Sequence, residues 1–425
     1  MGIEQLYSIY LQHPSVQTDT RKLKEGDLFF ALKGPSFNGN EFAQHALKMG
    51  AAYAVIDEPV DDKDERLILV DDVLTTLQLL AKHHREQFKI PFIGITGSNG
   101  KTTTKELVST VLATHYITYT TQGNLNNHIG VPLTILRIAN NAQMAVIEMG
   151  ANHQKEIEGY CVYAQPTHGI ITNAGKAHLE GFGGVEGVRK GKGELYAFIR
   201  EHNGVVFAYD DYDYLHDMVK GIEQVDWYGS RNGTVTGYVA ASEPFLQVAV
   251  TKGVSFNTLS TQLVGAYNLP NILCAVAVGK YFNVPGEKIK TAIESYAPSN
   301  SRSQLVEQGS NKIILDAYNA NPSSMKAAIE NFAKIDASHK VLLLGGMMEL
   351  GEESKQEHAG LIELINNYRW DKVVLVGGDF EHVRHPYIYF DTSAEAAVWL
   401  KEQGFENTYL LVKGSRSMQM EKVMG

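Results

Sequence analysis

A glycine-rich loop at residues 97–102 restricts the possible folds of this chain more than any other segment. It reads Gly-Ser-Asn-Gly-Lys-Thr, follows the apolar run 92–96, and precedes a segment with helical spacing. Glycines let the backbone curl so that its N–H groups point inward, and the start of a helix adds partial positive charge. A strand, such a loop and a helix in this order predict a triphosphate-binding site within an α/β domain.

The side chains of this loop indicate which ligands it would take. Lys101 would reach the outer phosphates, and the hydroxyl of Thr102 or Thr103 could bind Mg²⁺. The spacing departs from the usual form, because Ile95 stands where the first glycine is expected. A turn that contains glycines and a lysine by chance is the alternative, and the strand before it and the threonines after it argue against that. We therefore expect ATP and Mg²⁺, with nucleotide contacts from Gly97, Ser98, Asn99, Gly100, Lys101, Thr102 and Thr103.

The bulk composition narrows the class of protein. A chain of 425 residues is long enough for about three domains. The net charge is -10 without a basic run, which argues against a nucleic-acid-binding protein. Cys161 and Cys274 are too few for a disulfide framework or a cysteine-built metal site. Because no signal-peptide pattern and no run of about 18 apolar residues occurs, we expect a cytoplasmic protein without a membrane span.

Strands alternate with helices along most of the chain, which predicts an α/β fold of three domains. We expect a small N-terminal α/β domain at 1–87, a central parallel-sheet domain at 88–298 with a β-rich extension at 222–265, and a Rossmann-like, doubly wound domain at 299–425. Residues 298–301 are the expected linker. The expected strands are 27–32, 52–56, 92–96, 144–149, 169–173, 312–316, 340–344, 372–376 and 409–413, and the expected helices are 41–50, 74–88, 268–282, 323–332 and 356–368.

Several polar residues follow predicted strands, where ligands bind in parallel sheets. From the residues alone, Glu148 is a surface residue at a strand end or a magnesium ligand, and the first is favoured. His178 is favoured as a structural histidine over a metal ligand. Lys190 and Lys192 are favoured as a solvated, basic start of a helix. In contrast, the polar segment 316–322 favours ligand contact over simple turn chemistry.

Taken together, these segments resemble the Mur ligase family, and within it the MurF type, over nearly the whole chain. The phosphate loop marks the family, and the asparagine-rich loop 123–127, the loop 177–183 and the segment 318–322 together mark the MurF type. Gly346 stands where the family often has an aspartate, and His128 occupies a position that is often different. The other matching segments are 18–21, 26–29, 32–34, 37–39, 129–132, 148–150, 192–194, 349–351 and 412–416.

The resemblance implies an ATP-dependent ligase of small molecules that acts as a monomer. It would join D-alanyl-D-alanine to UDP-N-acetylmuramoyl-tripeptide through an acyl phosphate, giving the pentapeptide precursor of peptidoglycan. The first domain would hold the UDP part, and the site would be completed by closure of the domains. The alternatives are another ligase of the same family, such as a folylpolyglutamate synthetase or the ligase that adds the third stem residue, and an ATP-driven switch. The segment 318–322 and the N-terminal domain argue against the first, and Glu148, His178 and Lys192 argue against the second.

The resemblance also implies roles for individual residues. Lys101, Lys192 and His178 would be catalytic, and Lys192 would be carbamylated by CO₂ because a carbamate offers anionic oxygens to a metal ion. The expected ligands of Mg²⁺ are Thr102, Thr103, Glu148, His178 and Lys192, and the expected further nucleotide contacts are Asn268, Asn271, Arg302 and Asp316. The UDP part is expected at Thr20, Arg21, Lys33 and Asn38. The muramoyl peptide is expected at Asn124, Asn126, Asn127 and His128, and the dipeptide at Asn319 and Asn321.

Overall fold

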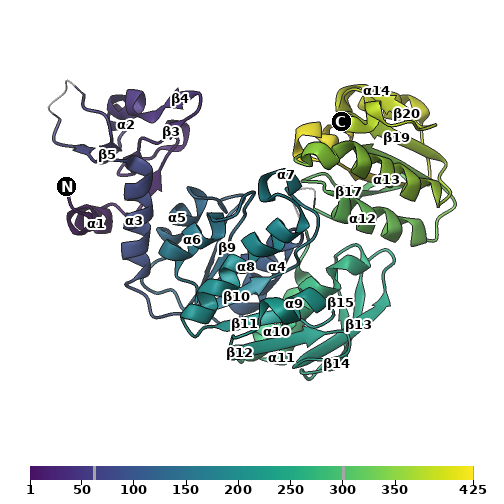
Figure 1. The fold of residues 1–425 in the computed structure, drawn as a ribbon, viewed down its shortest axis with the longest axis horizontal. Helices are drawn as coiled ribbons and strands as arrows, with labels where there is room; N and C mark the ends of the chain where they lie inside the picture. Colours follow the sequence, from purple (N-terminus) through teal and green to yellow (C-terminus); the bar gives the residue numbers. More distant parts are fainter. Residues whose placement is uncertain (61–63, 299–301, 425) are drawn as a thin grey trace.

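The computed structural model describes residues 1–60, 64–298 and 302–424. Three α/β domains follow one another along the chain, each built on its own sheet (Figure 1). The first and the third domain lie at opposite ends of the central one. The predicted fold class is therefore confirmed. The expected linker residues 299–301 lie outside the described residues. Within the described ranges, no helix is long and apolar enough to cross a membrane.

The first domain is a four-stranded parallel sheet in the order β1-β2-β5-β6. Its predicted strands and helices are present but shorter than expected, and a 3-10 turn at Gly39–Phe42 precedes the predicted helix at 41–50. A helix at the start of the chain was not predicted. The bounds are α1 Ile3–Gln12, β1 Val16–Gln17, β2 Leu28–Phe30, β3 Lys33–Gly34, β4 Phe37–Asn38, α2 Ala43–Lys48, β5 Tyr53–Ile56, β6 Leu67–Leu69 and α3 Val73–Arg85.

Helix α3 connects the first domain to the central one. The imidazole of His84 lies at this junction, where its Nδ1 accepts a hydrogen bond from the Tyr7 hydroxyl (3.0 Å) and its Nε2 donates to the carbonyl of Ile138 (2.8 Å). Burial lowers the pKa of His84, which keeps the ring neutral. The Tyr10 hydroxyl donates to the Leu136 carbonyl at 2.5 Å, so helix α1 is also bonded to the central domain.

The central domain is a nine-stranded sheet in the order β15-β14-β13-β12-β11-β10-β7-β9-β8. The strands from β8 to β12 are parallel, and β7, β9 and β10 are buried along their whole length because helices cover both faces. The β-rich extension predicted at 222–265 is confirmed, and it continues this same sheet. The strands are β7 Phe92–Thr96, β8 Thr118–Thr120, β9 Met144–Glu148, β10 His168–Ile171, β11 Val205–Tyr209, β12 Gln224–Gly229, β13 Val235–Ala241, β14 Gln247–Lys252 and β15 Thr258–Ser260.

The helices of the central domain place the site segments. The helix after the phosphate loop, α4, packs against α10; α4 covers the sheet at β7, β8 and β9, and α10 covers it at β11, β12 and β13. Helix α8 packs against α6 and α7 and contacts β7, β10 and β11. The bounds are α4 Lys101–Ala113, α5 Gly130–Ile135, α6 Glu156–Ala164, α7 Leu179–Phe182, α8 Val185–Glu201, α9 Asp213–Met218, α10 Leu269–Tyr281 and α11 Gly286–Ser295.

The C-terminal domain has a six-stranded sheet in the order β16-β17-β21-β18-β19-β20. All its strand pairs are parallel except the edge pair of β16 and β17. The predicted elements are confirmed within about two residues, whereas β16, β20 and α14 were not predicted. The bounds are β16 Gln304–Gln308, β17 Asn311–Asp316, α12 Pro322–Lys334, β18 Lys340–Gly345, α13 Ser354–Asn366, β19 Lys372–Val376, β20 Ile388–Phe390, α14 Ser393–Gln403 and β21 Tyr409–Lys413.

Candidate active site

A cavity of about 680 Å³ lies where the central and the C-terminal domain meet, at the carboxyl ends of β7, β9 and β10. Ligands bind at this edge in open parallel sheets. The cavity brings together residues from segments more than 300 positions apart in the sequence. Of the predicted site residues, it is lined by Ser98, Asn99, Gly100, Lys101, Thr102, Thr103, Asn124, Asn126, Asn127, Glu148, His178, Asn268, Asn271, Arg302, Asp316, Asn319 and Asn321.

The phosphate loop curls between β7 and α4. Gly100 has φ +78°, and a Cβ there would lie 2.7 Å from Oδ1 of Asn271, so this position requires glycine. Thr104 donates from its backbone N–H to the carbonyl of Gly100 (2.8 Å), which is the first turn of α4. The amides before it have no partner within the helix and are available to an anion.

Lys101 folds back over the loop. Its Nζ donates to the carbonyl oxygens of Gly97 (2.7 Å) and Ser98 (3.3 Å). Burial lowers the pKa of Lys101, the nearby Arg302 lowers it further, and the charge of Glu148 opposes both. If a triphosphate were bound in the loop, Nζ of Lys101 could exchange these two carbonyl contacts for stronger hydrogen bonds to anionic phosphate oxygens.

Thr172 and Asn173, which follow β10, form hydrogen bonds to the phosphate loop. The backbone N–H of Ser98 donates to the carbonyl of Asn173 (2.9 Å), and that of Asn99 donates to its side-chain Oδ1 (3.0 Å). Asn173 and Thr172 in turn donate to the carbonyl of Asn99. These contacts fix the curl of the loop, and Asn173 is a supporting residue that was not predicted.

A buried carboxylate lies beside the start of α4. Glu148, at the end of β9, is 1% exposed, so the expectation that it is a surface residue is wrong. Its Oε1 accepts hydrogen bonds from Thr102 (3.1 Å) and Asn126 (2.8 Å). Its Oε2 is buried and has no hydrogen-bond partner among the described residues. A buried carboxylate oxygen without a partner is costly, and a cation bound there would satisfy it.

Lys192 lies inside α8, and its side chain is 1% exposed. The expected solvated position is therefore wrong for Lys192, although Lys190 is exposed as expected. The ammonium group donates to the carbonyl of Ala151 (2.9 Å) and lies 4.8 Å from the centre of the Phe182 ring. Burial, together with the charge of Lys101, lowers the pKa of Lys192 well below its usual value, which favours the neutral amine over the ammonium form.

His178 lies at the start of α7 and lines the cavity. Its Nδ1 is hydrogen-bonded to the carboxylate of Glu349, which belongs to the C-terminal domain. Among residues 1–60, 64–298 and 302–424, no group of three His, Cys, Asp or Glu side chains is arranged to hold a metal ion. The metal role of His178 and of the predicted magnesium set stays a prediction.

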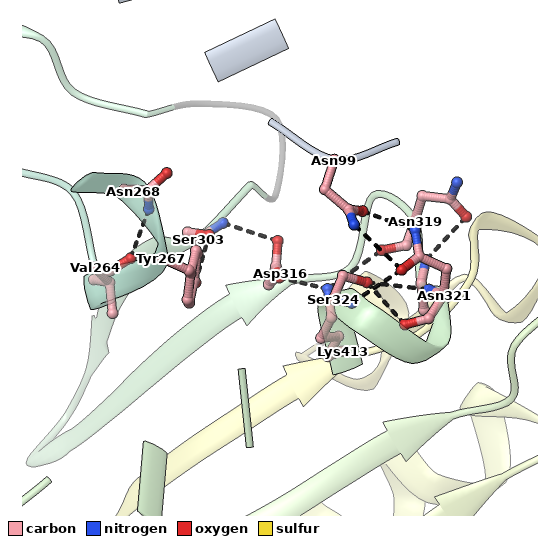
Figure 2. Close-up of polar contacts among 11 residues, drawn as sticks. Asn99, Val264, Tyr267, Asn268, Ser303, Asp316, Asn319, Asn321, Ser324 and Lys413 are labelled. Carbon is pink, nitrogen blue, oxygen red and sulfur yellow. Dashed lines mark hydrogen bonds and ion pairs between the residues drawn. The ribbon is translucent and has the colours of Figure 1, made fainter. Parts of the chain in front are cut away.

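The C-terminal wall of the cavity is polar (Figure 2). Asp316 accepts hydrogen bonds from the backbone N–H of Ser303 (3.1 Å) and from Nζ of the buried Lys413 (2.5 Å). The guanidinium of Arg302 lies 3.5 Å above the ring of Tyr318. Arg302 also forms no ion pair with another residue in the part of the chain that the structure describes, so its guanidinium is available to a phosphate.

Two predicted nucleotide contacts, Asn268 and Asn271, use their side chains in hydrogen bonds to neighbouring residues of the protein. Asn271 donates to Oδ1 of Asn268 (2.9 Å) and accepts from the Thr104 hydroxyl (3.0 Å), and Asn268 donates to the carbonyl of Val264 (2.9 Å). Both asparagines are buried. They fix the start of α10 against α4, and the cavity wall at this point takes its shape from these bonds.

The predicted dipeptide contacts differ in their surroundings. Asn319 is exposed at the cavity, and its Oδ1 accepts from the backbone N–H of Ala320 (2.9 Å). Asn321 caps α12, because its Oδ1 accepts from the backbone N–H of Ser324 (2.9 Å). Its Nδ2 donates to Oδ1 of Asn99 in the phosphate loop (2.7 Å; Figure 2). Asn321 therefore connects the two domains whether or not it contacts a substrate.

The predicted UDP contacts lie in the first domain, away from this cavity. Arg21 forms an ion pair with Asp19 (2.8 Å), Lys33 forms ion pairs with Asp57 (2.9 Å) and Glu58 (2.8 Å), and Asn38 donates to Glu58 (2.8 Å). Thr20 starts a 3-10 turn in the same domain. The side chain of His128, unlike its neighbours in the asparagine-rich loop, does not line the cavity; its carbonyl accepts from Gln78 (3.1 Å). These five roles stay predictions.

Some residues that shape the site were not predicted. They share no motif, because each acts through its position in the folded chain. Lys413 and Glu349 stand in segments that resemble the family, which was the only sequence signal for them. The set comprises Asn173, Ser303, Glu349 and Lys413.

Comparison with known proteins identifies the family. Family models match three segments: "Mur ligase family, catalytic domain" at residues 14–85, "Mur ligase middle domain" at 95–279, and "Mur ligase, glutamate ligase domain" at 301–416. The chain is 34% identical over 422 residues to the UDP-N-acetylmuramoyl-tripeptide--D-alanyl-D-alanine ligase of Bacillus subtilis, covering 96% of this chain and 92% of that protein. It is also 34% identical over 434 residues to the Escherichia coli protein of the same name, covering 96% and 92%.

Solved structures agree with this result. A MurF crystal structure from Acinetobacter baumannii matches with a TM-score of 0.88 and 31% identity, covering 96% of this chain and 92% of that one. MurF of Thermotoga maritima, solved in complex with ADP, matches with a TM-score of 0.88 and 27% identity, covering 97% of both chains. The fold, the cavity and these likenesses together show that the chain belongs to the Mur ligase family and, within it, to the MurF type.

Proposed function

We propose that this chain joins D-alanyl-D-alanine to the stem peptide of UDP-N-acetylmuramoyl-tripeptide at the expense of ATP. The observation that carries the proposal is that one cavity holds the phosphate loop, the buried Glu148 and the polar wall of the C-terminal domain. The relatives that bear this activity in their name cover more than nine-tenths of both chains. Since the reaction consumes ATP, we place it in the cytoplasm.

The domain assignment is part of this proposal. We place the boundaries at residues 87/88 and 298/299, assign the UDP part of the substrate to the first domain, and assign ATP to the central one. Thr20, Arg21, Lys33 and Asn38 are the proposed UDP contacts, and their ion pairs with Asp19, Asp57 and Glu58 would have to open or be shared with the ligand.

The residues around Glu148 fit a magnesium ion. A hard divalent cation prefers oxygen ligands, and the partnerless Oε2 of Glu148 and the hydroxyl of Thr102 supply two neighbouring ones. When bound, Mg²⁺ would neutralise charge on the transferring phosphoryl group. We propose that Thr102, Thr103, Glu148 and His178 hold this magnesium ion.

Lys192 is proposed to carry a carbamate. CO₂ reacts with a neutral amine, and the lowered pKa of Lys192 favours that form. The reaction forms a bond between Nζ and the carbon of CO₂ and releases one proton. The carbamate of Lys192 would offer anionic oxygens to a metal ion. It would replace the positively charged ammonium group, which burial destabilises at this position.

The reaction proceeds in two steps. The free carboxylate of the stem peptide attacks the γ-phosphorus of ATP, the bond to the bridging oxygen breaks, and ADP leaves. The amine of D-alanyl-D-alanine then attacks the carbonyl of the acyl phosphate, the amide bond forms, and phosphate leaves while the nitrogen loses a proton. Lys101 and Arg302 stabilise the charge on the transferring group, and most of the rate should come from this electrostatic effect and from positioning.

The test is the identity of the products. The protein is incubated with ATP, D-alanyl-D-alanine and either the diaminopimelate- or the lysine-containing UDP-tripeptide, and the products are identified by mass spectrometry. We expect UDP-muramoyl-pentapeptide, ADP and phosphate, each dependent on both peptide substrates. ADP release without pentapeptide would contradict the proposed function.

A further inference from the structure

His178 of the central domain and Glu349 of the C-terminal domain form a hydrogen bond across the domain boundary. Nδ1 of His178 faces Oε2 of Glu349, and the side chains are 17% and 52% exposed. An ionised carboxylate can only accept, so Nδ1 carries the proton. This bond lowers the pKa of Glu349, which keeps the carboxylate ionised. The other ring nitrogen, Nε2, has no hydrogen-bond partner in the described ranges, and His178 lines the cavity.

Both residues adopt an unusual backbone conformation. His178 has φ +52° and Glu349 has φ +61°, in the left-handed region that side chains other than glycine, asparagine, aspartate and histidine seldom occupy. Glu349 is therefore the more unusual of the two. Backbone strain of this kind persists where the surrounding structure requires it, and it is concentrated at functional sites.

The whole segment around His178 is bonded to the C-terminal domain. Lys176 forms an ion pair with Glu357, and its backbone N–H donates to the Ser323 hydroxyl (3.1 Å). The backbone N–H of Glu180 points to the carbonyl of Glu349 (3.5 Å). Among the described residues, the side chain of Glu349 forms the hydrogen bond to the ring of His178 that crosses this interface. If the C-terminal domain moved away, His178 would lose the acceptor that determines which nitrogen carries its proton.

We propose that Glu349 is a positioning residue that holds His178 in its Nδ1–H tautomer, and that it does so only while the C-terminal domain is docked. In this tautomer the lone pair of Nε2 is available to a divalent cation in the cavity. A carboxylate behind a metal-binding histidine fixes the ring and raises its basicity as a ligand. The inference rests on the proposed function, because it couples the metal side of that same site to domain closure.

The first experiment reads the tautomer without any turnover. Protein labelled with ¹⁵N-histidine is studied by NMR, and the His178 resonances are assigned by their loss in H178Q. We expect the proton on Nδ1 in the unsubstituted protein and in E349Q, whose amide oxygen still accepts, and on Nε2 for a large part of the population in E349A. E357Q is the matched control, because it removes the neighbouring ion pair to Lys176 but does not touch His178, and it should keep the Nδ1 proton.

The second experiment measures Mn²⁺ affinity in the presence of a non-hydrolysable ATP analogue. We expect E349A to weaken Mn²⁺ binding by about 10- to 100-fold, and E357Q to leave it unchanged. A proton on Nε2 in the unsubstituted protein would overturn the proposal, and so would an equal effect of E349A and E357Q on the tautomer. Absence of ligase activity with an Nδ1 proton in place would refute the proposed function and leave this inference standing.

Discussion

The side-chain amides of Asn99 and Asn321 face each other across the boundary between the phosphate loop and the C-terminal domain. Nδ2 of Asn321 lies 2.7 Å from Oδ1 of Asn99, and Nδ2 of Asn99 lies 3.4 Å from Oδ1 of Asn321. The same Oδ1 of Asn321 caps α12. The start of α12 is therefore hydrogen-bonded directly to the loop proposed to hold the triphosphate. Docking of the C-terminal domain is thereby coupled to the position of this loop.

The pair predicts different effects for two substitutions at Asn321. Asn321→Asp keeps the acceptor that caps α12 and removes the donor to Asn99, so stability should change little while kcat/KM for ATP falls about tenfold, the equivalent of one hydrogen bond. Asn321→Ala also removes the cap and should cost about 1 kcal/mol of stability. Steady-state kinetics and thermal unfolding measure the two effects.

Asn99→Ala provides the matching half of a double-mutant cycle. If the bond is the reason for the loss, the Asn99→Ala/Asn321→Asp double variant should be no worse than the poorer single variant. Additive losses in kcat/KM would show that the two asparagines act independently, contrary to this prediction.

Lys101→Ala should abolish substrate-dependent release of ADP. Its ammonium group is the cation of the phosphate loop, and removing one charged or hydrogen-bonding group from a transition state costs on the order of 10²- to 10³-fold in kcat. The fold should survive, because the two bonds of Lys101 go to backbone carbonyls of its own loop. Near-normal turnover of Lys101→Ala, with an unchanged melting temperature, would contradict the site assignment.

Lys192→Ala should be inactive, and added short carboxylates such as acetate should restore part of the activity by replacing the proposed carbamate. Lys190→Ala is the matched control, because Lys190 lies two residues away on the same helix but is exposed, and its loss should have little effect. Incubation with ¹³CO₂ should give a ¹³C carbamate resonance that Lys192→Ala lacks. Full activity of Lys192→Ala without a carboxylate would remove the carbamate from the mechanism.

The stability of the protein should fall when the pH drops below the ordinary pKa of histidine. Burial lowers the pKa of His168, at the start of β10, from 6.5 to about 4. The unfolded chain therefore binds a proton in this window and the folded chain does not, so the free energy of unfolding rises with pH from about 4 to about 6.5. From this residue alone we expect a loss of about 2 kcal/mol between pH 7.5 and pH 5.

Urea unfolding at the two pH values measures this loss. His168→Gln should reduce the pH dependence, because it removes the group that titrates, whereas His382→Gln, at an exposed position, should not change it. An equal pH dependence in His168→Gln and in the unsubstituted protein would show that other groups, such as the buried His84, account for it.

Local pattern was enough to predict the fold class and several of its central strands. The strands at 92–96 and 372–376 have the predicted bounds, because a buried parallel strand is a continuous apolar run between turn residues. Helix α14 and the short edge strands β16 and β20 were missed, since partly exposed segments mix apolar and polar residues and give a weaker signal. The buried strand β11 and the helices α5, α6, α9 and α11 were also missed, and for β11 partial exposure is not the reason. From the residues alone, before the resemblance, Glu148 and Lys192 were favoured as surface residues, because a local pattern carries no information on what packs against a residue.

The sequence by itself determined the chemistry that is local in the chain: glycines that allow the phosphate loop to curl, a lysine and hydroxyls at its end, and polar residues at the ends of strands. Only the tertiary structure decided which distant groups meet. It buried Glu148 and left one oxygen without a partner, lowered the pKa of Lys192, and brought Glu349 to His178 and Asn321 to Asn99. Burial and contact between domains depend on how the sheets and helices pack, and no spacing along the chain encodes those distances.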